Sequence, residues 1–115
     1  MSLRITTGDV DGIAVLWLDG RIVLGEETGV LRETVKNLIT EGSKKVVLNM
    51  ENVTLIDSAG IGALVFAYTT ARSNGAKIRL CHLGAKFNEL LAITKLLTVF
   101  DISPTQAEAV RCFKE

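Results

Sequence analysis

One segment of the chain places an acid, a hydroxyl and two glycines close together: Asp57-Ser58-Ala59-Gly60-Ile61-Gly62. A serine in such a setting can be a catalytic nucleophile, part of a phosphate-binding loop, or the acceptor of a phosphoryl group. Each of these functions needs further residues at defined spacings. The neighbouring sequence therefore discriminates between them.

Three catalytic or nucleotide-binding patterns fail around Ser58. A nucleophile elbow requires glycine two positions before the serine, where this chain has Ile56. A P-loop requires a lysine after its last glycine, and none follows Gly60 or Gly62. A dinucleotide-binding fingerprint requires a third glycine, which is missing. We therefore expect no catalytic residues and no enzyme activity.

The other candidate bases and metal ligands are few and scattered. His82 is the only histidine and falls inside an expected strand, so we expect a structural residue there, buried with a hydrogen bond or at the sheet surface. Cys81 and Cys112 match no C-x-x-C pattern and no cysteine cluster supports a metal. We expect two buried, reduced thiols, no metal and no cofactor.

Composition excludes several classes of partner. Thirteen basic residues balance thirteen acidic ones, so no strong field attracts nucleic acid or anionic lipid. The longest mostly apolar run, Ile61–Tyr68, is far too short to span a bilayer, and the first residues lack the pattern of a signal peptide. We expect a cytoplasmic protein without membrane insertion whose residues 1–115 form a single domain.

Hydrophobic periodicity predicts the elements that position this segment. Asp11-Gly12 predicts a tight hairpin turn and Asp19-Gly20 a second turn. The expected strands are Leu3–Thr7, Ile13–Leu18, Lys45–Met50 and Lys77–Leu83, with short ones at Arg21–Leu24 and Thr98–Ile102. Glu51–Asp57 is expected to be a loop. A hairpin followed by alternating strands and helices predicts an α/β fold, in which about four helices pack against a mixed sheet of four to five strands.

The expected helices are Glu26–Thr40, Ser58–Ser73, Ala85–Thr94 and a final helix from Ser103. For this last helix, Pro104 at the first position and Gln106 three residues after Ser103 predict a capping box. The inward stripes of the first two helices are Leu31, Val35, Leu38 and Ile39, and Ile61, Leu64, Val65 and Tyr68.

Two interpretations of the start of the second helix remain open. Asp57 or Ser58 can be the N-cap whose oxygen satisfies a free backbone N–H, worth about 1 kcal/mol. The same position suits a phosphoserine, because a helix N-terminus favours negative charge. Gly60 and Gly62 each cost the helix about 1 kcal/mol relative to alanine. They indicate that another surface approaches closely, either the sheet beneath or a partner outside.

The order of elements and the Asp-Ser-x-Gly segment resemble the STAS domain family, and more narrowly the bacterial anti-sigma-factor antagonists. The resemblance runs from about Leu3 to Phe113 and is most specific at Val46–Met50 and Val53–Leu64. Two positions differ from the family pattern. Gly20–Leu24 lacks the acid that many members carry after the second strand, and Lys95 stands where the family often has glycine.

The resemblance implies a protein that switches partners. An unmodified antagonist binds an anti-sigma factor and so releases a sigma factor for transcription. The anti-sigma factor is also a serine kinase that phosphorylates the motif serine, here Ser58, and a PP2C-type phosphatase reverses this change. The resemblance places the partner-binding surface at Asp57, Ser58, Ala59, Gly60 and Ile61. The alternatives are a STAS subunit of a larger assembly, such as a stress-signalling complex or a lipid-transport ATPase, and a small-molecule or nucleotide sensor, both without phosphorylation.

Overall fold

The computed structural model describes residues 3–96 and 98–114, which build a sheet of order β1-β2-β3-β4-β5. The strands are β1 (Leu3–Val10), β2 (Ile13–Ile22), β3 (Lys45–Ile56), β4 (Lys77–Cys81) and β5 (Asp101–Ser103). The helices are α1 (Glu26–Thr40), α2 (Ser58–Ser73), α3 (Ala85–Ile93) and α4 (Gln106–Lys114). β1 and β2 are antiparallel and the other neighbouring strands are parallel. The predicted α/β fold with a mixed sheet is confirmed.

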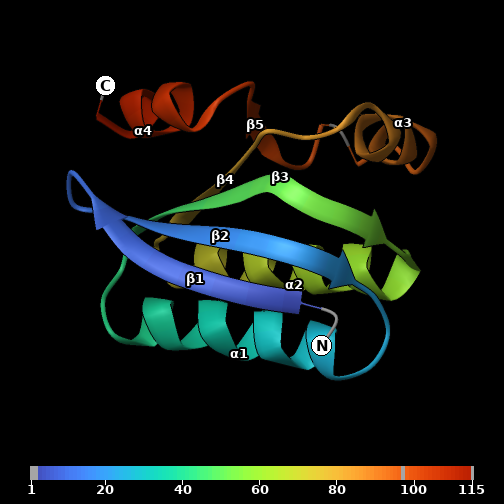
Figure 1. Ribbon diagram of the computed structural model, residues 1–115. Coiled ribbons are helices and arrows are strands. Elements are labelled where there is room, and N and C mark those ends of the chain that lie inside the picture. Colours follow the sequence, from blue (N-terminus) through green and yellow to red (C-terminus); the bar gives the residue numbers. More distant parts are fainter. Residues whose placement is uncertain (1–2, 97, 115) are drawn as a thin grey trace.

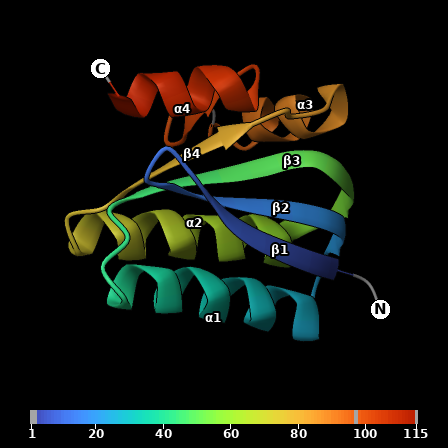
Figure 2. The same cartoon turned by 60° about the vertical axis from the view of Figure 1, so that its left-hand side comes forward.

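The helices cover the two faces of the sheet differently (Figure 1, Figure 2). α1 and α2 lie side by side on one face, and their buried residues form the main core with the strands. α4 packs on the other face over a smaller cluster that includes Val15, Val47 and Ala109. Cys81 is buried in this cluster as expected, but Cys112 is exposed, so the expectation of two buried thiols is wrong for Cys112. α3 contributes Phe87 and Leu91 to the main core. No helix in the described ranges is long and apolar enough to cross a membrane.

The bounds predicted for α1 and α2 are confirmed, but their inward stripes are confirmed only in part. Leu31, Val35 and Ile39 of α1 are buried as expected, whereas Leu38 is half-buried against the core. The sheet side of α2 is built largely from small residues. Its buried residues are Gly60, Ile61, Ala63, Leu64, Ala67 and Ala71. Small side chains let the axis of α2 lie close to the strands beneath it.

The hairpin predicted at Asp11-Gly12 is confirmed. Both turn residues have positive φ, 55° and 83°, and Asp9 Oδ1 accepts a hydrogen bond from the Gly12 N–H at 2.9 Å. β1 is longer than predicted because Gly8 stays in the strand with the Trp17 ring packed against it. A Cβ at Gly8 would lie 2.8 Å from that ring. An aromatic ring over a strand glycine supplies the packing that the glycine lacks.

The turn predicted at Asp19-Gly20 and the loop predicted after Met50 are both wrong, because these two segments pair with each other. β2 continues to Ile22 and β3 continues to Ile56, with Gly20 opposite Val53 and Ile22 opposite Ile56. The register shifts twice between Trp17 and Arg21, where Gly20 adopts a φ of 115°. Such bulges keep a turn-like sequence inside a sheet. The extension brings the end of β3 beside the end of β2.

His82 lies just beyond β4 and not within a strand, because β4 ends at Cys81. Its φ is 57°, and its Nε2 accepts a hydrogen bond from the backbone N–H of Gln106 at 3.2 Å. Asn49 Nδ2 donates to the Gln106 side-chain oxygen at 2.9 Å. The expected structural hydrogen bond of His82 is present, and it ties the start of α4 to the ends of β3 and β4.

The capping box predicted at Ser103 and Gln106 is wrong. Ser103 is buried in β5 opposite Cys81, and α4 begins at Gln106. Thr105 performs the capping instead, since its Oγ1 accepts a hydrogen bond from the Glu108 N–H at 3.2 Å. A hydroxyl residue followed three positions later by an acid or amide occurs twice here, as Ser103 with Gln106 and as Thr105 with Glu108. Because Ser103 pairs with β4, only Thr105 is left to cap the helix.

Lys95, just after the end of α3, has a φ of 61°, a left-handed conformation that costs a residue with a Cβ about 1–2 kcal/mol. Lys95→Gly should therefore raise the free energy of unfolding by about 0.5–1 kcal/mol. Lys95→Ala is the matched control and should give no such gain, because alanine keeps the Cβ. Chemical denaturation of the three proteins compares them, and equal stabilities of the glycine and alanine variants would contradict the prediction.

Candidate functional site

The segment singled out from the sequence lies where β3 ends and α2 begins. Ile56, the last residue of β3, pairs with Ile22 of β2. The next backbone N–H, that of Asp57, donates to the Ile22 carbonyl oxygen at 3.3 Å. The first turn of α2 is therefore held against the end of β2 and the connection that leads to α1.

Asp57 is the N-cap of α2, which decides between the two candidates for that role. Its Oδ1 accepts a hydrogen bond from the Gly60 N–H at 2.8 Å. Its Oδ2 accepts a second one from the Leu24 N–H at 3.0 Å. The bond from Leu24, followed by that from Gly60, lowers the pKa of Asp57 below its ordinary value, because both stabilise the carboxylate. One side chain thus joins the helix to the β2–α1 connection.

Ser58 is the first residue of α2, and it is exposed. Its hydroxyl makes no hydrogen bond to any residue within the described ranges, and the capping role that it could have had belongs to Asp57. The fold therefore does not depend on the Ser58 hydroxyl. A group attached to that oxygen would extend from the surface without breaking a contact.

The two glycines of the segment have different surroundings. A Cβ at Gly60 would lie 2.0 Å from the Ile22 carbonyl oxygen and 2.7 Å from Ile56 Cγ1, so only glycine fits. A Cβ at Gly62 would meet nothing within 4 Å. The close approach of the sheet therefore explains why residue 60 is glycine. Gly62 carries the helix penalty of glycine for no reason found among its described neighbours.

The other residues assigned to the predicted surface lie deeper. Ala59 is half-buried, Gly60 is buried, and Ile61 keeps only 8% of its surface exposed. These three residues therefore expose less of their surface to a partner than Ser58 does.

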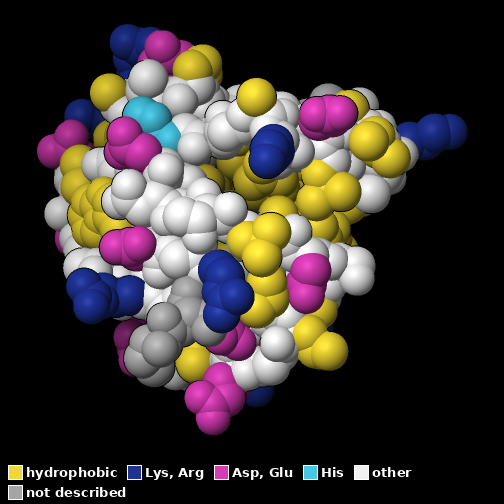
Figure 3. Space-filling view, turned by 45° about the vertical axis from the view of Figure 1, so that its right-hand side comes forward, with side chains coloured by type: hydrophobic (Ala, Val, Ile, Leu, Met, Phe, Trp, Pro, Cys, Tyr) yellow, Lys and Arg dark blue, Asp and Glu magenta, His cyan; other side chains and the backbone are white. Residues whose placement is uncertain are grey.

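Two apolar residues that the sequence did not assign to the site flank it. Leu24, whose N–H Asp57 holds, is 78% exposed, and Leu55, near the end of β3, is 51% exposed. Leu55 also borders a cleft of about 530 Å³ between the end of β3 and α3, with Val53, Phe87 and Leu90 among its lining residues. Hydrophobic side chains gather around a hollow on one side of the molecule (Figure 3). Exposed apolar residues grouped in this way are typical of a protein-binding surface.

Comparison with known proteins agrees with this architecture. The STAS domain model matches residues 4–109. The chain is 23% identical over 112 residues to a candidate anti-sigma factor antagonist of Bordetella bronchiseptica, BtrV, covering 97% of this chain and 96% of that protein. A candidate anti-sigma factor antagonist of Thermotoga maritima superposes with a TM-score of 0.84 at 23% identity, over 96% and 95% of the two chains. Phosphorylated SpoIIAA, a Bacillus cell fate determinant, superposes with a TM-score of 0.74 at 16% identity, over 96% and 99%.

The glycine geometry predicts opposite effects for two identical substitutions. Gly60→Ala should lower the free energy of unfolding by about 1–3 kcal/mol or more, because the new methyl group overlaps the Ile22 carbonyl. Gly62→Ala should raise it by up to about 1 kcal/mol, because alanine favours the helix and meets nothing. Each variant serves as control for the other in urea denaturation. Equal effects would show that helix propensity alone governs both positions.

The substitution Asp57→Asn distinguishes the contributions of the two hydrogen bonds that the Asp57 carboxylate accepts, from Leu24 and from Gly60. The amide keeps one oxygen for the Gly60 N–H but loses the acceptor for Leu24, so exchange of the Leu24 amide hydrogen should accelerate more than that of Gly60. The lowered pKa means that the carboxylate stabilises the fold above the unfolded-state pKa and loses this effect as pH falls through the folded-state pKa. The stability difference between wild type and variant should therefore shrink at acid pH. A difference that stays constant down to strongly acid pH would contradict this assignment.

Proposed function

Because the chain belongs to the STAS domain family, we propose that it is an anti-sigma-factor antagonist whose surface around Ser58 binds an anti-sigma factor. Phosphorylation of Ser58 by that partner, acting as a serine kinase, ends the binding and frees the partner to hold its sigma factor. A PP2C-type phosphatase restores the binding state. The protein itself acts by binding and not by catalysis.

The observation that carries the proposal is the separation of two roles between neighbouring residues. Asp57 caps α2 and anchors Leu24, while the exposed Ser58 hydroxyl has no role in the fold. A kinase can therefore modify Ser58 without removing a stabilising contact. BtrV and the Thermotoga protein are both named as anti-sigma factor antagonists, which supports an anti-sigma factor as the partner. SpoIIAA has a structure in its phosphorylated form, which supports the idea that this fold tolerates phosphorylation.

The charge of a phosphate explains how binding would end. Phosphorylation adds about −1.5 to −2 charges at neutral pH. The Gly60 N–H at the helix start already donates to Asp57, so it is not free to neutralise the new group. A partner packed over Leu24, Leu55 and Ser58 would have to bury that charge among apolar side chains, which is costly without a matching cation.

Gly62 supports a close contact with the partner. It lies one turn after Ser58 on the same side of α2, since residues four apart are neighbours on a helix surface. Its environment within the chain is open, so its lack of a side chain benefits only a molecule outside. The backbone or a large side chain of the anti-sigma factor could pack against α2 at this point.

Two substitutions at Ser58 test the switch. Ser58→Ala should change the free energy of unfolding by less than about 0.5 kcal/mol, because the hydroxyl makes no contact, and it should bind the anti-sigma factor even with the kinase and ATP present. Ser58→Asp should also stay folded but lose about 100-fold or more in affinity, because its carboxylate would be buried unpaired. Thermal melts and isothermal titration calorimetry with the anti-sigma factor measure both quantities.

Thr69→Asp, an exposed position about three turns further along α2, is the matched control and should leave binding unchanged. Gly62→Ala should weaken binding although it favours the helix. After incubation with the kinase and ATP, mass spectrometry should find one phosphate at Ser58. Undiminished binding of Ser58→Asp, or phosphate found at Thr69, Thr70 or Ser73 instead, would refute the proposed switch. Binding without any phosphate transfer would favour a subunit of a larger assembly.

A further inference from the structure

Leu24 is the most exposed of the large hydrophobic residues in the described ranges, with 78% of its surface accessible to solvent. A single exposed apolar side chain is common in soluble proteins. Leu24 differs because its backbone is anchored to a distant segment. Its N–H donates to Asp57 Oδ2 at 3.0 Å, from 33 positions away in the sequence. The fold therefore holds this residue beside Ser58 and leaves its side chain uncovered.

The turn that carries Leu24 is fixed on both sides of it. Before Leu24, the Ile22 carbonyl oxygen accepts a hydrogen bond from the Asp57 N–H at 3.3 Å. After Leu24, Gly25 has a φ of 128°, and its carbonyl oxygen accepts a hydrogen bond from the Thr28 hydroxyl at 3.1 Å. A partner would therefore have little disorder to remove from this turn, and a segment ordered in advance contributes more to affinity.

The composition of the turn indicates what kind of contact it makes. Val23, Leu24 and Gly25 carry no charge. Leu55, which is 51% exposed, comes two residues before Asp57 and adds a second apolar side chain to this region. An aliphatic side chain is removed from water only when another apolar surface closes around it. The residues that dominate protein interfaces are buried in this way, in pockets of the partner.

We propose that Leu24 is the apolar anchor of the interface, that it inserts into an apolar pocket of the anti-sigma factor, and that Asp57 is a positioning residue that holds Leu24 in place. This inference rests on the proposed function, since it assigns roles within the surface around Ser58. The Asp57 carboxylate is already occupied by the Gly60 and Leu24 N–H groups. Asp57 therefore contributes to binding through Leu24 and not through a contact of its own.

The position of Leu24 connects the anchor to the proposed switch. The β2–α1 connection and the start of α2 lie at the same end of the molecule (Figure 1). Because Asp57 binds the Leu24 N–H and precedes Ser58 directly, a partner pocket that closes around Leu24 also covers Ser58. A phosphate on Ser58 would hold the two surfaces apart by its bulk and charge, so that Leu24 could no longer enter the pocket.

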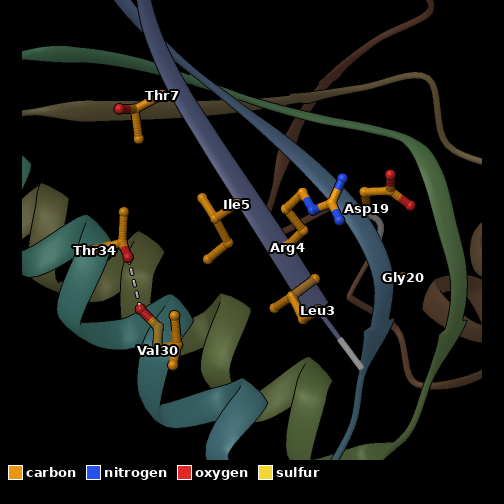
Figure 4. A pocket seen from close by; sticks show the side chains of 8 residues that line it. All are labelled: Leu3, Arg4, Ile5, Thr7, Asp19, Gly20, Val30 and Thr34. Carbon is orange, nitrogen blue, oxygen red and sulfur yellow. Dashed lines mark hydrogen bonds between the residues drawn. The ribbon is translucent and has the colours of Figure 1, made fainter. Parts of the chain in front are cut away.

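Two other exposed apolar residues provide matched controls. Ile93 is 72% exposed and is the last residue of α3. Val30 is 48% exposed, lies one turn into α1, and lines a groove of about 580 Å³ between β1 and α1 (Figure 4). Ile93 matches Leu24 in exposure. Val30 reports whether a partner covers the β1–α1 groove instead of the turn.

Isothermal titration calorimetry with the anti-sigma factor tests the anchor. Leu24→Ala should bind about 30-fold or more weakly but melt at the wild-type temperature, because its side chain is exposed in the free chain. Leu24→Met keeps an apolar side chain of similar size and should keep most of the affinity. Ile93→Ala and Val30→Ala should each change the affinity by less than about twofold. A loss in either control as large as that in Leu24→Ala would overturn the anchor.

A double-mutant cycle tests the positioning role of Asp57. At neutral pH, Asp57→Asn should weaken binding about tenfold or more when Leu24 is present. In the Leu24→Ala background the same substitution should change the affinity by less than about threefold, because no anchor is left to position. Additive losses would overturn the positioning role, since Asp57 would then contact the partner itself. Circular dichroism checks that each variant is folded. If Asp57→Asn does not fold, the Leu24 variants decide alone.

Ser58→Asp, measured in the same series, distinguishes failure of this inference from failure of the proposed function. If Ser58→Asp loses affinity while Leu24→Ala keeps it, the proposed switch stands and the anchor is overturned. If the wild-type chain binds no anti-sigma factor, both are overturned. Loss of affinity in Ser58→Asp and in Leu24→Ala, with both controls and Leu24→Met still binding, is the result expected.

Discussion

The first turn of α2 lies so close to the end of β2 that no side chain fits between them. At Gly60 the Ile22 carbonyl oxygen occupies the place where a Cβ would be. Asp57 secures the contact from both sides, through the N–H groups of Gly60 and Leu24. The end of β2, the connection to α1, the end of β3 and the start of α2 all meet here, so the shape of the site depends on this approach.

That contact also explains how the site can carry a modification. The residue that holds the helix and the residue exposed for a kinase are neighbours, but they are not the same. Had Ser58 been the cap, a phosphate on its oxygen would have removed a bond that supports α2. With Asp57 as the cap, the proposed switch changes surface charge while the backbone beneath it stays in place.

The pairing of β2 with β3 supports the site from below. The ends of both strands pair beyond the bulges at Trp17–Arg21, and the Asp57 N–H that precedes α2 bonds to the last residue of β2. The proposed switch uses side chains at this helix start, so its geometry depends on strands that are distant from each other in the sequence.

The sequence alone determined the features whose causes are local. The Asp11-Gly12 hairpin and the bounds of α1 and α2 follow from turn chemistry and apolar periodicity, which act within a few residues. Tertiary structure decided the rest. The Asp19-Gly20 segment is a bulge and not a turn because a distant strand pairs with it, and Ser103 is lost as a cap because β4 pairs with it. Likewise, Gly60 and Gly62 look equivalent in the chain. Only the position of the Ile22 carbonyl, 38 residues before Gly60 in the sequence, shows that the first glycine serves the fold and leaves the second facing outward.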